Sequence, residues 1–483
     1  MLRPAMTSAD HTAPVPLSSL PKALLVGVRL PGVSEVEFEA SLDELERLVK
    51  TLGYRVVSRM TQTRGTLAPT AVLGEGKLGE LAAITGGSGY AGVEVERVKD
   101  KARKRREAIE AGQTIVDEED DDADDEPGSA TPPADTDDLK LIAVDHEISP
   151  SQLRNLERAT GMTVLDRTGV IIEIFHRHAH SREARMQVEI ARLRYESPRV
   201  RESPRGKERQ AGRGSGEAGL ELDRRKIRDR IAELKEQLEA VQKEYSVRRA
   251  QRQQARRVAL VGYTNAGKSS LMRALTGSDV YVENKLFATL DTTVRALSPE
   301  VEPRVLVSDT VGFIKKLPHD LVASFKSTLD EASEASLLLH VVDASDPSWQ
   351  AQLEVTREVL TEIGAHAVPS RLVMNKVDRL SADELLALRA AQPEAWFLSA
   401  KSPSDVADLR LRIIAFFEAS YVQAEVLVPF SEQKLIAEMH ATMNVTGTRY
   451  EEEGVFVQVR CDAAALGRLR ERLGEASVTL LAE

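Results

Sequence analysis

The residues with the clearest capacity for chemistry form one loop, Gly262-Tyr263-Thr264-Asn265-Ala266-Gly267-Lys268-Ser269. This loop fits the pattern G-x-x-x-x-G-K-[ST], in which backbone amides cradle phosphate groups. Gly262 and Gly267 let the backbone turn tightly and approach an anion without a Cβ in the way. Lys268 would reach the β- and γ-phosphates, and the Ser269 hydroxyl would ligate magnesium. The loop therefore predicts a site for a nucleoside triphosphate with Mg²⁺.

The segments on either side of the loop suit that site. Residues 257–261 are an apolar run that predicts a buried strand, and residues 268–275 predict a helix that Gly277 closes. The N-terminus of that helix would point its positive dipole end at the phosphates, together with the loop amides. A chance Gly-rich turn would not need this strand–loop–helix order.

Further short motifs follow other predicted strands. From about residue 256 to 421 the chain alternates strands and helices, which is typical of a doubly wound, mostly parallel α/β fold. The strands at 304–308, 372–374 and 396–398 lead into Asp309-Thr310-Val311-Gly312, Asn375-Lys376-Val377-Asp378 and Ser399-Ala400-Lys401. In the first motif, Asp309 can hold magnesium through a water, and the Gly312 amide can meet the γ-phosphate.

The last two motifs indicate the base. The Asp378 carboxylate only accepts hydrogen bonds, so it can pair with the N1–H and the exocyclic amine of guanine. Adenine has no such pair of donors, and its N1 would face a carboxylate without a proton between them. Asn375 and Ala400 would read the O6 edge and shape the site, and Lys376 would lie along the base. The sequence therefore predicts guanine nucleotide binding, with GTP and GDP as the ligands.

Composition sets outer limits on this interpretation. The 483 residues suffice for two to four domains, and the net charge of -11 by itself argues against a nucleic-acid binder. One nearly all-acidic run at residues 117–126 supplies much of that charge, however. The single cysteine, Cys461, excludes an internal disulfide and favours a reducing cytosol. We find no apolar run of membrane-spanning length and no signal-peptide pattern, so a cytoplasmic protein is expected.

The chain before the loop predicts a small α/β domain at residues 22–195, after a loose leader at 1–21. Strands are predicted at 23–28, 54–59 and 139–144, and helices at 150–160 and 181–195. The run Ser41-Leu42-Asp43-Glu44 resembles a capping box that would start another helix, which Gly53 would stop. The short run at 74–78 lacks the serine or threonine of a nucleotide loop.

Three histidines alternate directly after the apolar run at residues 170–175. On a strand, His176, His178 and His180 would share one face, which leaves two interpretations open. They could bind a metal, or they could be polar surface residues, since no carboxylate or cysteine cluster accompanies them.

Two segments interrupt the apolar pattern. Residues 101–138 combine a basic run, the acidic run and a Pro-rich end, which predicts a disordered insertion. It is either a solvated charge run or a segment in which acidic residues compete with RNA for basic ones. Residues 196–255 predict a Gly/Arg-rich loop followed by a long helix, half of a helical hairpin. Its basic end either packs on a neighbouring domain or contacts an RNA backbone, and it comprises Arg248, Arg249, Arg252, Arg256 and Arg257.

Taken together, these motifs resemble the HflX group of P-loop GTPases, within the translation-factor class. Inside the nucleotide module the resemblance rests on the loop 262–269 and on segments 286–291, 309–314 and 317–322. Outside it, the resemblance rests on segments 148–157, 166–169 and 222–227. It implies a GTPase domain at 256–421, preceded by the α/β domain with its hairpin linker and followed by a small α+β domain at 422–483.

The resemblance also implies roles for particular residues. Lys268, Thr289 and Gly312 would be the catalytic groups, and Ser269 and Thr289 would ligate Mg²⁺, Thr289 only while the γ-phosphate is present. The first switch would add further nucleotide contacts from Phe287, Ala288, Thr289, Leu290 and Asp291.

Two positions depart from common GTPase patterns. Phe313 stands where many GTPases place a water-orienting glutamine, so slow intrinsic hydrolysis and activation by a ribosome are expected. The same phenylalanine also suits plain core packing, and the two readings are compatible. Thr292 replaces the proline that is usual in the family, which would loosen the first switch.

The function implied by this resemblance is a GTP-hydrolysing switch. Such a switch would act as a monomer on the large ribosomal subunit and its RNA, and would split or rescue stalled or inactive ribosomes. Two alternatives stay open from the sequence: an assembly chaperone that uses GTP only for timing, and an RNA-remodelling NTPase that works through the N-terminal domain.

Overall fold

The computed structural model describes residues 20–89, 138–200, 215–250, 256–277, 286–287, 293–301, 303–315 and 331–481. The predicted leader, the charged insertion, residues 201–214, 288–292 and 317–322 lie outside the described residues, apart from the leader's last two positions and Asp138. The chain divides into two compact units, Met1–Ile174 with Tyr195–Pro204 and Phe175–Arg194 with Arg205–Glu483. In the part of the chain that the structure describes, no helix is long and apolar enough to cross a membrane.

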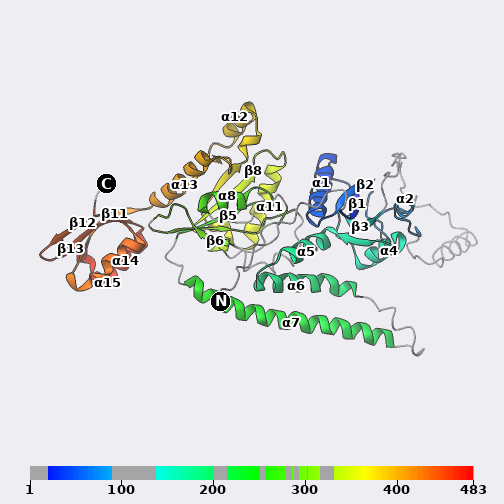
Figure 1. The fold of residues 1–483 in the computed structure, drawn as a ribbon, viewed down its shortest axis with the longest axis horizontal. Helices are drawn as coiled ribbons and strands as arrows, with labels where there is room; N and C mark the ends of the chain where they lie inside the picture. The colour runs from blue at the N-terminus through cyan, green and yellow to red at the C-terminus, as the bar shows by residue number, and fades with distance from the viewer. Residues whose placement is uncertain are drawn as a thin grey trace, which may run out of the picture. The chain divides into compact units, whose positions relative to one another are not determined.

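The first unit contains a parallel four-stranded sheet (Figure 1). Its strand order is β2 (Arg55–Thr63), β1 (Lys22–Arg29), β3 (Leu139–Val144), β4 (Thr163–Asp166). Among the described residues, it is accompanied by helices α1 (Glu35–Thr51), α2 (Glu75–Thr85) and α4 (Pro150–Thr160). Buried residues of α2 and α4 form one core with β1 and β3, so these two helices cover one face of the sheet. Helix α1 packs against β1 at Gly27, where a Cβ would lie 2.8 Å from Leu42 Cδ2.

The start of α1 differs from the prediction. The helix begins at Glu35 and is capped by Ser34, whose side chain accepts a hydrogen bond from the Glu37 amide. The predicted capping box at Ser41 is therefore wrong, because the residues before it already favour a helix and carry their own cap. Ser41 instead lies inside α1, and its hydroxyl donates to Asp145 at 2.6 Å. The predicted stop is confirmed, since Gly53 follows the helix with φ of +81°.

The apolar run with the alternating histidines is helical. It forms α5 (Arg167–His178), followed by α6 (Arg182–Glu196). The expectation that the three histidines share a strand face is therefore wrong, because residues two apart on a helix point in nearly opposite directions. Among the described residues, no cluster of three histidine, cysteine or acidic side chains could hold a metal ion.

Helix α6 and the long helix α7 (Ser215–Ala250) form the predicted helical hairpin (Figure 1). The two helices lie side by side and share a small apolar cluster that includes Met186, Ile190 and Leu234. The predicted basic face does not continue to Arg257. Arg256 and Arg257 belong to the next strand, where they pair with Asp462 and Glu334 instead of extending the helix.

The second sheet has six strands in the order β10 (Trp396–Phe397), β9 (Ser370–Asn375), β8 (Leu337–Asp343), β5 (Arg256–Val261), β7 (Val305–Asp309), β6 (Thr293–Ala296). All neighbours are parallel except β6 and β7. The helices that the structure describes in this module are α8 (Lys268–Thr276), α11 (Trp349–Glu362), α12 (Ala382–Ala391) and α13 (Pro403–Glu418). One core joins the sheet to α8 and α13, and a second joins it to α11. The doubly wound α/β prediction is confirmed.

The last module is a small α+β domain, as predicted, with the element order βαββαβ (Figure 1). Its elements are β11 (Val422–Val428), α14 (Lys434–Thr442), β12 (Asn444–Glu451), β13 (Gly454–Cys461), α15 (Ala463–Leu473) and β14 (Val478–Leu480). The sheet order is β12-β13-β11-β14, and every pairing is antiparallel.

Short 3-10 turns occur in several parts of the described chain, at Ser197–Arg199, Ala365–Ala367, Val377–Arg379, Phe430–Glu432 and Glu475–Ser477.

Candidate nucleotide site

The phosphate-loop residues lie at the carboxyl end of β5, directly before α8. Gly262 has φ of +149° and Gly267 has φ of +98°. A Cβ on Gly262 would lie 2.1 Å from the Val341 carbonyl oxygen, and one on Gly267 would lie 2.3 Å from Asn375 Nδ2. Both glycines are therefore required by backbone conformation and by close approach, as the sequence pattern predicts.

Lys268 is buried at the start of α8 and points back into the loop. Its Nζ donates to the carbonyl oxygens of Gly262 at 3.0 Å and of Tyr263 at 2.9 Å. Burial lowers the pKa of Lys268 to about 8, although the charge of Asp309 works in the opposite direction. A polyphosphate beside this amine would favour its charged form, so the position suits an anionic ligand.

Ser269 and Asp309 meet at the ends of α8 and β7. The Ser269 hydroxyl donates to Asp309 Oδ2 at 2.7 Å, and Asp309 is fully buried. A hydroxyl and a carboxylate side by side are the hard oxygen donors that Mg²⁺ prefers, and few protein ligands are usual for it in nucleotide sites. The residues present therefore fit a magnesium ion that is held partly by nucleotide phosphates. The other predicted ligand, Thr289, lies outside the described residues.

The segment after β7 is joined to the phosphate loop through its backbone. The Phe313 amide donates to the Gly262 carbonyl at 3.1 Å, and the Thr264 amide donates to the Phe313 carbonyl at 2.8 Å. The Phe313 side chain is 1% exposed and belongs to the core between the sheet and α11. Phe313 therefore fills the core, which agrees with the packing interpretation and leaves this position without a polar side chain.

Asn375 joins the phosphate loop to the base-side loops. Its Nδ2 donates to the Ala266 carbonyl at 2.9 Å, and its Oδ1 accepts from the Ala400 amide at 3.0 Å. The side chain is 1% exposed. Asn375 thus braces two loops against each other, and its part in reading the O6 edge stays a prediction.

Asp378 has the character that guanine recognition requires. The Ser399 hydroxyl donates to Asp378 Oδ1 at 2.7 Å, and this hydrogen bond, with help from the charge of Lys401, lowers the pKa of the Asp378 carboxyl. The group is therefore a carboxylate at neutral pH and can accept from both guanine donors. Val377, by contrast, contributes to the apolar packing under these loops.

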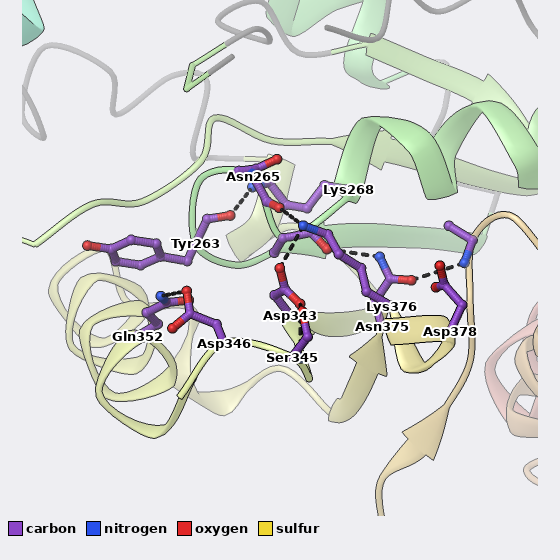
Figure 2. A network of polar contacts seen from close by, with 12 residues as sticks. Tyr263, Asn265, Lys268, Asp343, Ser345, Asp346, Gln352, Asn375, Lys376 and Asp378 are labelled. Carbon is purple, nitrogen blue, oxygen red and sulfur yellow. Dashed lines mark hydrogen bonds and ion pairs between the residues drawn. The ribbon is translucent and has the colours of Figure 1, made fainter. Parts of the chain in front are cut away.

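Two acidic residues of the site, Asp343 and Asp405, were not predicted from the sequence, and Figure 2 shows Asp343 beside Lys376. Lys376 Nζ donates to Asp343 Oδ2 at 2.7 Å and to the Asn265 carbonyl at 2.6 Å, so Asp343 fixes the lysine of the guanine motif. The Tyr263 hydroxyl accepts from the Lys315 amide at 2.7 Å. Asp405 Oδ2 accepts from the Ser399 amide at 2.8 Å. Asp343 directly follows an apolar run at residues 337–342 and is the last residue of β8, and that position was the signal that could have identified it.

The remaining predicted residues divide into placed and undescribed ones. The Thr310 hydroxyl donates to the Leu260 carbonyl of β5 at 2.7 Å, and Val311 is buried, so both side chains have structural contacts in this segment. Phe287 is 3% exposed, has φ of +57°, and packs edge-on against Phe175 with ring centroids 4.6 Å apart. Ala288, Thr289, Leu290 and Asp291 lie outside the described residues.

Three protein-family models match this chain. They are described as GTP-binding GTPase N-terminal, matching residues 39–99 and 130–176, GTP-binding GTPase Middle Region, matching 178–252, and 50S ribosome-binding GTPase, matching 257–376. A solved structure described as a complex of SsGBP and GDP aligns with a TM-score of 0.44 and 23% identity, covering 82% of this chain and 98% of that one.

Curated relatives extend the match over nearly the full length. The GTPase HflX of Gluconacetobacter diazotrophicus is 58% identical over 454 residues, which cover 94% of this chain and 98% of the relative. The GTPase HflX of Escherichia coli (strain K12) is 35% identical over 448 residues, covering 91% and 93%. The phosphate loop, the guanine motif and these matches agree, and the chain belongs to the HflX family of GTPases.

Proposed function

We propose that this GTPase is a switch that binds the large ribosomal subunit and splits or rescues stalled or inactive ribosomes. Its support is the match of residues 257–376 to a family described as 50S ribosome-binding GTPase. The burial of Phe313 adds a chemical reason for such a partner. Since Phe313 cannot orient the attacking water, we expect slow hydrolysis by the free protein and faster hydrolysis when a bound partner completes the site.

The roles of the chain's own residues follow from the geometry. The loop from Gly262 to Lys268 would bind the phosphates through its amides, and Lys268 would neutralise charge on the β- and γ-phosphates. The Gly312 amide would meet the γ-phosphate. Ser269 and Thr289 would hold Mg²⁺, with Asp309 acting through a water, and the bound ion would neutralise charge on the phosphate oxygens.

Release of the γ-phosphate would provide the switch. With GTP bound, Thr289 and Gly312 would be ordered around the γ-phosphate, and hydrolysis would release both segments. The N-terminal domain and the hairpin of α6 and α7 would carry that change to ribosomal RNA. The proposed location is the cytoplasm, where this partner occurs, and the proposed state is a monomer, which size-exclusion chromatography with light scattering tests.

The test is GTP turnover by the full chain with and without purified large ribosomal subunits, for the wild type and for Lys268→Ala. We expect the subunits to stimulate the wild type about tenfold or more and the variant not at all. Turnover that ribosomes leave unchanged would refute the proposal. Stimulation without dissociation of whole ribosomes in a sedimentation assay would favour the assembly alternative over splitting.

A further inference from the structure

The side chain of Thr264 has a property that the predicted roles of the loop do not explain. Thr264 is 7% exposed, and its Oγ1 is buried with no hydrogen-bond partner among the residues that the structure describes. A buried hydroxyl without a partner is unfavourable, and its persistence in a ligand-binding loop points to a partner supplied by the ligand. The backbone amide of Thr264 is already used, because it donates to the Phe313 carbonyl at 2.8 Å.

Thr264 borders the same small space as two groups that are expected to contact the γ-phosphate. A Cβ built on Gly312 would lie 2.8 Å from Thr264 Cγ2 and 3.1 Å from Lys268 Nζ. The Thr264 methyl group and Cα, the Lys268 amine and the Gly312 backbone therefore surround one point, and the hydroxyl is carried on the same Cβ as that methyl group. Figure 2 shows Lys268 and the loop around it from close by. The position is at the phosphate end of the site, away from Asp378 and the base.

Three other described side chains at this end have fixed partners or are apolar. The Phe313 side chain is in the core, and the Ser269 hydroxyl donates to Asp309 at 2.7 Å. Lys268 donates to two carbonyl oxygens. The Thr264 hydroxyl can rotate to donate to an anionic oxygen without breaking any hydrogen bond that the structure records, so its interaction with a phosphate has no competing loss.

We propose that the Thr264 hydroxyl donates a hydrogen bond to a γ-phosphoryl oxygen of bound GTP, and that Thr264 thereby distinguishes GTP from GDP and assists hydrolysis. In that reaction the water oxygen bonds to the γ-phosphorus, and the bond to the β,γ-bridging oxygen breaks. The electron pair of that bond stays with GDP, and the proton of the water passes to the phosphate product. The Thr264 hydroxyl remains intact as a donor to charge on the γ-phosphoryl oxygens. This role is independent of any ribosome.

Two substitutions separate the hydroxyl from the methyl group. Thr264→Val keeps the branched shape beside Gly312 and removes only the donor. Thr264→Ser keeps the donor and removes the methyl group. Thr356→Val is the matched control, because Thr356 is 1% exposed in α11 and its hydroxyl donates to the Gln352 carbonyl at 2.9 Å, outside the nucleotide loops.

The experiment uses the full chain without ribosomes. Affinities for GDP and for the β,γ-imido analogue of GTP are measured by fluorescence titration, and hydrolysis is measured under single-turnover conditions. For Thr264→Val we expect GDP affinity within about twofold of wild type, but about tenfold losses in analogue affinity and in hydrolysis rate. Thr264→Ser should recover most of both losses, and Thr356→Val should match the wild type.

Three outcomes would overturn the proposal. Thr264→Val could retain both analogue affinity and rate, which would mean that the hydroxyl does not contact the γ-phosphate. It could lose GDP and analogue affinity equally, which would mean that Thr264 only shapes the loop. Thr264→Ser could be worse than Thr264→Val, which would mean that the methyl group against Gly312 is what matters. Retained GDP binding by each variant establishes that it is folded.

Discussion

The parallel sheet of the first unit and the mostly parallel sheet of the nucleotide module differ in the polar residues at the carboxyl ends of their strands. Such edges are where α/β proteins commonly bind ligands. In the first unit, Asp145 follows β3 and Arg167 follows β4, and Arg167 Nη1 donates to Asp145 Oδ1 at 2.7 Å while its Nη2 pairs with Glu44. In the part of the nucleotide module that the structure describes, Lys268 Nζ donates to two carbonyl oxygens, and Thr264 Oγ1 has no hydrogen-bond partner.

Asp166, at the end of β4 in the first unit, has hydrogen-bond donors at both carboxylate oxygens. It is fully buried, and its Oδ1 accepts from the Gly169 amide and the Tyr195 hydroxyl, both at 2.7 Å. Its Oδ2 accepts from Arg199 Nη2 at 3.0 Å. Burial and the charge of Asp166 raise the pKa of Tyr195, so the phenol stays a donor.

The difference teaches what makes such an edge a binding site. Polar residues at the ends of parallel strands are not sufficient, because in the first unit they neutralise one another. In the nucleotide module some polar groups lack fixed partners of opposite charge, so an anion can complete them. Substitutions at the first edge should therefore cost stability, and substitutions at the second should cost activity.

The largest effect is expected for Asp166→Ala. The change leaves Arg199 and the Tyr195 hydroxyl without their buried acceptor, which should destabilise the first unit by about 3–5 kcal/mol. Hydrogen exchange of the β1 and β3 amides measures this loss. GDP affinity should stay unchanged, and Asp166→Asn, which keeps the shape, should cost less. A loss under about 1 kcal/mol would show that this edge is not held by its charges.

The converse result is expected for Lys268→Met. Single-turnover hydrolysis should fall about 10²–10³-fold, because one charged donor to the transition state is lost. Stability without nucleotide should not fall, because burial lowers the pKa of Lys268 to about 8 and the folded state therefore pays for holding the charge below that pH. Urea unfolding at pH 7 measures this, and a clear destabilisation would contradict the comparison.

The residues of the nucleotide site were largely predicted from the sequence, whereas the paired charges at the strand ends of the first unit were not. The phosphate loop, Asp378 and the alternation of strands and helices were predicted because each depends on local spacing and on local apolar periodicity. The cap at Ser34 was missed because two serines precede the same apolar face, and only the structure selects between them. The histidine pattern failed because an apolar run of six residues does not distinguish a strand from a helix, and here it lies in α5, which ends at His178.

Long-range pairing was the part that spacing could not provide. Asp343 and Lys376 are 33 positions apart, and Ser41 and Asp145 are 104 apart. The apolar run before Asp343 could have placed it at the end of a strand, but nothing in the sequence shows what it contacts. Likewise, nothing in the local sequence indicates that the Asn375 side chain forms hydrogen bonds with both Ala266 and Ala400.

Inside the second sheet, the free energy of unfolding should depend on pH through one buried histidine. His340 on β8 is 8% exposed, and burial, with repulsion from Arg357, lowers its pKa from 6.5 to about 4. The unfolded chain therefore binds a proton that the folded state does not, and stability should fall as pH drops from about 6.5 to 4. The expected loss is about 3 kcal/mol in total.

Urea unfolding of the second unit across that pH range measures the effect. His340→Leu should flatten the slope, whereas substitution of the exposed His366 should leave it unchanged. An unchanged slope in His340→Leu would assign the acid sensitivity to other groups.

The smallest of these effects is expected for Asp343→Asn. Loss of the charge opposite Lys376 should loosen the guanine motif and lower GDP affinity about tenfold, without measurable unfolding. Asp346→Asn is the matched control, because Asp346 accepts from Gln352 at 2.8 Å and not from Lys376. Equal losses in both variants would mean that the general negative charge after β8, rather than the Lys376 contact, is what matters.

The Asn375 side chain has a consequence for how this site can change over time. The Asn375 side-chain amide is hydrogen-bonded both to the carbonyl of Ala266 and to the backbone amide of Ala400. A shift of the phosphate loop should therefore displace the loop that contains Ala400 as well. Mutations in the two loops should then be epistatic, with combined effects that differ from the sum of the single ones. Base specificity and affinity for the phosphates would then change together during evolution.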